Sequence, residues 1–114
     1  MKYRAGTITW VSNDPHGTKD ERPVVVIRHR DRPYSSVECT VMCLGRGSRN
    51  HNHSTPELEK ETHYTGMTFS KATHLLPWSI HTIPPGAILQ HRAQGQLTTA
   101  GKKLVVRAFA KMMK

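Results

Sequence analysis

Two strand-like segments in the first quarter of the chain constrain the fold more than any other feature. The first alternates around Ile8 and Trp10, which is typical of a half-buried strand. The second is an unbroken apolar run over residues 24–27, which favours a more central strand. Gly6 and Pro23 stand at the strand starts, where a missing side chain or a missing N–H is tolerated. The pattern predicts two strands joined by a short polar loop.

Further strands are expected along the chain. The strand-like segments lie at about 6–12, 22–30, 36–45, 63–70 and 73–83, and a long polar loop is expected over 45–62. Pro77 interrupts the last strand, and proline cannot donate to the hydrogen bonds between strands. This strand is therefore expected at a sheet edge or at a bulge.

Two segments have helical character. Residues 56–61 are expected to form one helical turn, with Thr55 as its N-cap and acidic residues placed well for the helix dipole. Near the C-terminus, after a cap at Thr98 or Thr99, apolar residues repeat at helical spacing and are expected to pack on the sheet: Leu104, Val105, Ala108, Phe109 and Met112. Short strands followed by one amphipathic helix predict a mainly β protein, namely a small SH3-like antiparallel barrel with a C-terminal helix.

Length and charge limit the possible functions. A chain of 114 residues has room for one domain, spanning 1–114. Seventeen Lys and Arg against eight Asp and Glu give a net charge of +9, which indicates attraction to a polyanion, chiefly nucleic acid. The alternative is a merely solvated basic surface. No apolar run approaches the ~20 residues of a membrane span, so neither a membrane anchor nor a signal peptide is expected.

The two cysteines, Cys39 and Cys43, fall on one strand-like segment. Four residues apart, they face the same way but lie too far along the strand for an easy disulfide. Buried free thiols in a reducing cytoplasm are expected. Without a C-x-x-C pair a cysteine zinc site is not expected, and we expect no metal and no cofactor.

Several segments, taken in order, resemble the MazF/PemK family of toxin endoribonucleases. That family has a G-x-I-x-x-V strand, a D-P turn and an R-P-hydrophobic strand along one wall of an RNA groove, and an Ile-Arg-Thr-Ile strand before a terminal helix. The matching stretches here are 6–11, 14–15, 22–27, 37–44 for the third strand, 80–83 and 97–113. The resemblance implies a MazF/PemK/CcdB-type barrel that forms a homodimer. It also implies metal-free cleavage of single-stranded RNA by the ribose 2′-OH, and neutralisation by an acidic antitoxin.

Departures from the family pattern concern the reaction. The third strand ends at Gly45 where the family has a hydroxyl residue, although Ser48 is nearby. His81 replaces the family's arginine, and Trp78 falls where some members have a catalytic acid. These differences favour a second hypothesis, a non-catalytic nucleic-acid-binding or protein-binding module on the same barrel.

Metal-free cleavage requires a base, an acid and a cation that stabilises the phosphorane. The resemblance assigns the cation to Arg22, and His81 and His16 are the candidate acid and base because histidine titrates near neutrality. Because none of these residues, nor Ser48, lies on a predicted apolar face, we expect their alanine variants to fold.

RNA contacts are expected from a polar loop and from one tryptophan. The loop residues Arg46, Ser48, Arg49, His51 and His53 are candidates for contacts to phosphates and base edges. Two histidines without carboxylate or thiolate ligands would make a weak metal site. Trp78, on a broken edge strand, is expected to stack on an unpaired base, whereas Trp10 is expected in the core.

Overall fold

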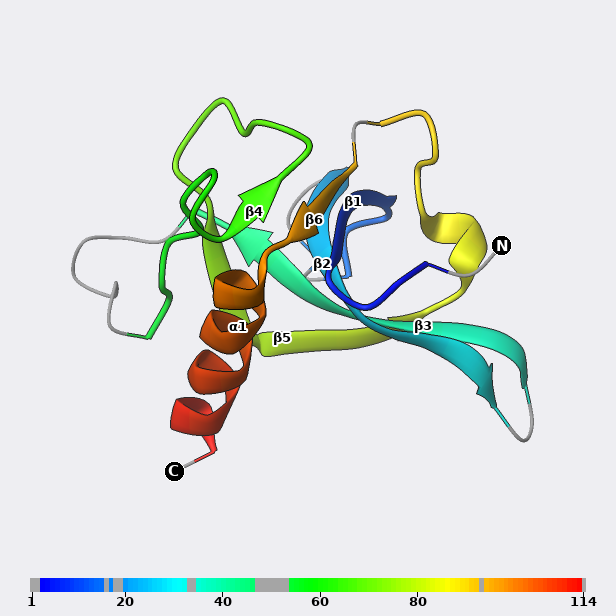
Figure 1. Ribbon diagram of the computed structural model, residues 1–114. Helices are drawn as coiled ribbons and strands as arrows, with labels where there is room; N and C mark the ends of the chain where they lie inside the picture. Colours follow the sequence, from blue (N-terminus) through cyan, green and yellow to red (C-terminus); the bar gives the residue numbers. More distant parts are fainter. Residues whose placement is uncertain are drawn as a thin grey trace.

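The computed structural model describes residues 3–15, 17, 20–32, 35–46, 54–92 and 94–113. Its elements in chain order are β1 (Thr7–Ser12), β2 (Glu21–Arg32), β3 (Ser35–Gly45), β4 (Tyr64–Thr65), β5 (His74–Ile83), η2 (Pro85–Ala87), β6 (Gly95–Leu97) and α1 (Thr99–Met112). Within the described residues the strands form one six-stranded sheet in the order β4-β6-β1-β2-β3-β5, and neighbours pair antiparallel. Figure 1 shows α1 beside this sheet and the long β2–β3 pair extending past its other strands.

The mainly β fold with a C-terminal helix is confirmed, but a closed barrel is not. β4 and β5 lie at opposite edges of the sheet, and no pairing joins them among the described residues. The sequence pattern predicts where strands lie and which face of each is apolar. It does not predict which strands pair with one another, so it cannot show whether the sheet closes into a barrel.

The apolar run of β2 supplies both faces of the sheet. Val25 belongs to a core cluster with Ile8 and Met42, whereas Val24 and Val26 belong to a second cluster. Successive side chains of a strand point to opposite faces, so an unbroken run suits a strand that is covered on both. The prediction of a central strand is confirmed, because β2 lies between β1 and β3.

Helix α1 begins where the sequence predicted. Thr98 is the N-cap, and its hydroxyl accepts a hydrogen bond from the backbone N–H of Gly101 at 3.1 Å. A Cβ at Gly101 would lie 2.0 Å from the His63 carbonyl oxygen, so glycine is what allows the helix to approach the 63–65 segment.

The apolar face of α1 that contacts the sheet is narrower than expected. Val105 and Ala108 are buried in the first core cluster, with Leu104 packed against it. Phe109 and Met112 are 38% and 39% exposed, so that part of the predicted stripe is not covered by this chain.

The expected helical turn over 56–61 is wrong. The backbone N–H of Leu58 donates to the Thr73 carbonyl, and the N–H of Leu75 donates to the Pro56 carbonyl. These bonds hold the segment in an extended form beside β5 and bury Leu58 in the first core. Tertiary pairing therefore overrides the local capping pattern.

The strand predicted over 63–70 is reduced to Tyr64–Thr65, because Gly66 at φ 89° turns the chain. The short strand β6 was not predicted. Its three residues, Gly95–Leu97, carry too little periodicity to be recognised without their partners β1 and β4.

Both expectations for Pro77 are confirmed. β5 is an edge strand, and its register with β3 shifts between Met42 and Leu44, opposite the residues around Pro77. Cys39 and Cys43 are buried free thiols, and burial raises the pKa of Cys39 to about 11. Among the described residues, no helix has the length and apolar character needed to cross a membrane.

Candidate functional site

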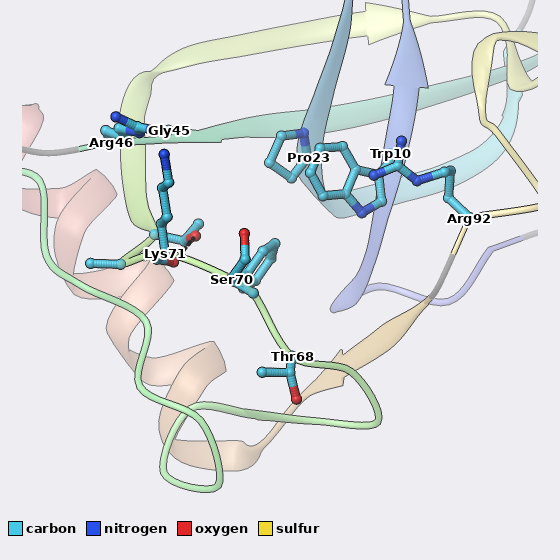
Figure 2. A pocket seen from close by; sticks show the side chains of 11 residues that line it. Trp10, Pro23, Gly45, Arg46, Thr68, Ser70, Lys71 and Arg92 are labelled. Carbon is cyan, nitrogen blue, oxygen red and sulfur yellow. Dashed lines mark hydrogen bonds between the residues drawn. The ribbon is translucent and has the colours of Figure 1, made fainter.

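A pocket of about 320 Å³ lies where the ends of the first three strands meet the segment before β5. Its described lining comes from β1, β2, the end of β3 with the residue after it, the 68–73 segment and the loop before β6: Trp10, Pro23, Gly45, Arg46, Thr68, Phe69, Ser70, Lys71, Ala72, Thr73 and Arg92. Figure 2 shows these side chains around the hollow, with Arg46 and Lys71 at one end and Trp10 and Arg92 at the other. The sheet thus brings together five segments that are far apart in the sequence.

One end of the pocket is cationic. Arg46 and Lys71 are exposed, and Figure 2 shows the Lys71 side chain reaching toward the end of β3 where Arg46 begins the next segment. None of the described lining residues is acidic. The hydroxyl group of Ser70 adds hydrogen-bonding capacity, whereas the Thr68 hydroxyl already accepts a hydrogen bond from Lys60 Nζ. This end of the pocket can attract and orient a phosphate group.

The other end is an aromatic wall. The guanidinium carbon of Arg92 lies 4.1 Å from the centre of the Trp10 ring, a cation–π contact. The Phe69 ring is tilted against Trp10 at 6.3 Å, and an Arg92–Glu21 ion pair holds the guanidinium from the side. The expectation that Trp10 belongs to the core is therefore wrong, because Trp10 is only partly buried and faces the pocket.

Arg22 lies under the pocket and not in it. It is 3% exposed; its Nε donates to Asp14 Oδ1 at 2.6 Å, and its Nη1 donates to the Leu44 carbonyl at 2.8 Å. A Cβ at Gly45 would lie 2.9 Å from Nη1, so the guanidinium occupies the space a hydroxyl side chain would need there. The reason for expecting Arg22→Ala to fold does not hold, because Arg22 is buried and the substitution would leave a buried carboxylate without this partner.

His81 and Arg22 are not close together in this structure. The Arg22 guanidinium lies beside Gly45, at the end of β3. His81 on β5 pairs with Val41, four residues before Gly45 on β3, and four residues correspond to roughly 13 Å along a strand. It is half-buried, and Ser79 Oγ lies 3.0 Å from its Nε2. Trp78, on the same strand, is 52% exposed, which leaves its ring accessible. Neither is among the described residues that line the pocket.

Five predicted site residues, His16, Ser48, Arg49, His51 and His53, lie outside the described residues. Of the others, Arg46 lines the pocket and Arg22 underlies it. The sequence analysis missed Lys71, Arg92 and the pocket-facing side of Trp10. The charges of Lys71 and Arg92 are visible in the sequence, but nothing in the sequence places these two residues around one pocket.

No group of three or more His, Cys, Asp or Glu side chains that could hold a metal ion is found in the part of the chain that the structure describes. In comparisons with known proteins, neither a protein-family model nor a curated protein matches the chain. A functional proposal therefore rests on the pocket geometry, the charge and the ordered sequence motifs.

Proposed function

We propose that the protein is a toxin-type endoribonuclease that binds single-stranded RNA in this pocket, on a fold of the MazF/PemK type. The observation that carries the proposal is the combination of cationic, hydroxyl and aromatic side chains around one hollow whose described lining has no acidic residue. Single-stranded nucleic acids are bound by such combinations, because cations contact the backbone while aromatic rings stack on bases. The net charge of +9 supports the same ligand class.

Cleavage would proceed by attack of the ribose 2′-OH on the adjacent phosphate, without a metal. Arg46 and Lys71 offer the exposed positive charge that stabilises a phosphorane, and Arg22 supports the pocket floor by holding Leu44 in place. His16 is assigned a proton transfer by the family resemblance and by the chemistry of histidine. His81 stands where the family has arginine and does not line this pocket, so its candidacy for the second proton transfer rests on the chemistry of histidine alone. An acidic antitoxin and a second copy of the chain are the partners that this proposal implies.

The test is incubation of a long single-stranded RNA with the purified protein in excess chelator. The proposal predicts fragments that end in a 2′,3′-cyclic phosphate and a 5′-hydroxyl. The variant Arg46→Ala/Lys71→Ala should lose roughly 10²-fold or more in rate, the scale for one preorganised electrostatic donor. Lys103→Ala/Arg107→Ala on α1 removes the same charge from exposed positions elsewhere and is the matched control. Equal loss in both variants would show that net charge, and not the pocket, is responsible.

A second candidate function is RNA binding without cleavage. Two observations favour it: Asp14 already pairs with the Arg22 guanidinium, and the register of β5 places His81 away from it. In the same assay this function predicts salt-sensitive binding at the pocket and no fragments. Both functions are compatible with a homodimer. The molar mass measured by light scattering at ~100 µM protein, well above a micromolar dissociation constant, tests whether the dimer forms.

A further inference from the structure

We propose that Trp10 and Arg92 form a subsite for one nucleobase, in which the base stacks on the outer face of the Arg92 guanidinium. The inference rests on the proposed function, since it concerns single-stranded RNA in the same pocket. The guanidinium carbon of Arg92 lies over the Trp10 ring, 4.1 Å from its centre, so the indole covers one side of the guanidinium. The Arg92 side chain is 37% exposed, and the proposal places the base on its exposed side.

The position of Arg92 is set by the backbone. The N–H of Leu89 donates to the Trp10 carbonyl at 2.8 Å, and the N–H of Arg92 donates to the Leu89 carbonyl at 3.1 Å. An isolated bridge between Val11 and Ile88 adds to this attachment. The segment that carries Arg92 is therefore attached to the strand that carries Trp10, and the contact between the two side chains is preorganised.

Glu21 orients the guanidinium. It forms an ion pair with Nη1 of Arg92, and its own side chain is 40% exposed. A planar guanidinium that is held from one side by a carboxylate and from below by an indole keeps its remaining face in a defined orientation. Glu21 is thus a positioning residue for the subsite, and Arg92 is the residue that contacts the base.

The rest of the pocket indicates what kind of ligand brings the base. Arg46 and Lys71 lie at the opposite end, where a phosphate would be held, and the pocket volume of about 320 Å³ is of the size that accommodates one small ligand unit. A nucleotide of an unpaired strand has both groups, a planar base and a flanking phosphate. Base stacking on aromatic side chains and guanidinium planes is the usual way that proteins hold unpaired bases.

The experiment uses Trp10 as its own reporter. The chain has two tryptophans, so Trp78→Phe leaves Trp10 as the sole indole, and all measurements are made in this background. A short single-stranded RNA and an oligomer of the same length with abasic sugars are titrated against the protein. We expect the RNA to change Trp10 fluorescence and the abasic oligomer to bind with little change.

Arg92→Lys keeps the charge but removes the planar face, so it should weaken RNA binding by about tenfold, the scale for losing one stacked base. It should leave the affinity for the abasic oligomer within about twofold, and Glu21→Gln should show a smaller loss of the same kind. RNA binding with unchanged affinity in Arg92→Lys and no fluorescence change would overturn the subsite while the proposed function stands. Failure of the wild-type protein to bind RNA at all would instead overturn the proposed function.

Discussion

Two arginine–carboxylate pairs in this protein differ in burial. Arg22 pairs with Asp14 in the interior, with side-chain exposures of 4% and 0%, whereas Arg92 pairs with Glu21 at 37% and 40%. Each pair contains one of two consecutive residues of β2, Glu21 or Arg22. Because successive side chains of a strand point to opposite faces, one residue is directed to the core and the next to the pocket side. The two pairs therefore differ in burial because of the positions of Glu21 and Arg22 on the strand, and not because of the residue types involved.

The difference explains which arginine is available to a ligand. Breaking a buried pair leaves an uncompensated charge in the interior, whereas an exposed pair contributes little to stability and can exchange partners. Arg22, which the family resemblance makes the catalytic cation, is held by Asp14 and by the Leu44 carbonyl. Arg92, which the sequence did not single out, lies at the pocket wall.

The largest expected effect is on the buried pair. Asp14→Asn keeps the shape of the side chain but removes its charge, and it should lower the free energy of unfolding by about 3–5 kcal/mol. That is a large share of the total for a domain of this size. Urea denaturation followed by circular dichroism measures it, and Asp14→Leu/Arg22→Met, which removes both charges, should recover most of the loss. A decrease below about 1 kcal/mol in Asp14→Asn would show that the pair behaves like the exposed one.

Cys39 lies in the core cluster that also contains Val24 and Val26, two residues on the same face of β2 as Arg22. Burial raises its pKa from 9.0 to about 11, so at pH 8 its thiolate fraction should be roughly 100-fold below that of a free thiol. A thiol reagent should therefore label it slowly in the native protein and rapidly in denaturant. Fast labelling in native Asp14→Asn would show that loss of the pair opens this core.

The same thiol makes stability depend on pH. Folding favours its neutral form, so the stabilisation is intact below pH 9 and is lost as the pH rises through about 11. Unfolding by urea at pH 8 and pH 10.5 measures the change, with Cys39→Ala as the variant that should show a smaller decline. An equal decline in both proteins would assign the effect to other groups.

A smaller effect is expected at the exposed pair. Glu21→Gln should change the free energy of unfolding by less than about 1 kcal/mol, since both side chains remain solvated. Glu21→Gln and Asp14→Asn make the same chemical change, carboxylate to amide, one at an exposed and the other at a buried side chain. Similar losses in the two variants would remove the distinction drawn between the two regions.

The smallest expected effect is that of salt on these two pairs. Between 0.05 M and 1 M salt the exposed pair should be screened, because the Debye length falls to about 3 Å at 1 M, while the buried pair should keep its contribution. The difference in unfolding free energy between wild type and Glu21→Gln should therefore shrink toward zero at 1 M salt. The corresponding difference in unfolding free energy for Asp14→Asn should stay within about 0.3 kcal/mol of its low-salt value.

What the sequence alone determined is the local structure. The strand periodicity of β1 to β3, the edge position of the Pro77 strand, the buried cysteines and the Thr98 cap of α1 all follow from properties of neighbouring residues. The expected turn over 56–61 failed because Leu58 pairs with a segment distant in the sequence.

What only the tertiary structure decided is the environment of each charge. Arg22 is buried because Asp14 and the end of β3 close around it, and Gly45 leaves the space for its guanidinium. Arg92 faces Trp10 because backbone hydrogen bonds attach its loop to β1. Local patterns record which residues alternate on a strand, but burial depends on which distant segments cover each face, and that is settled only when the sheet is assembled.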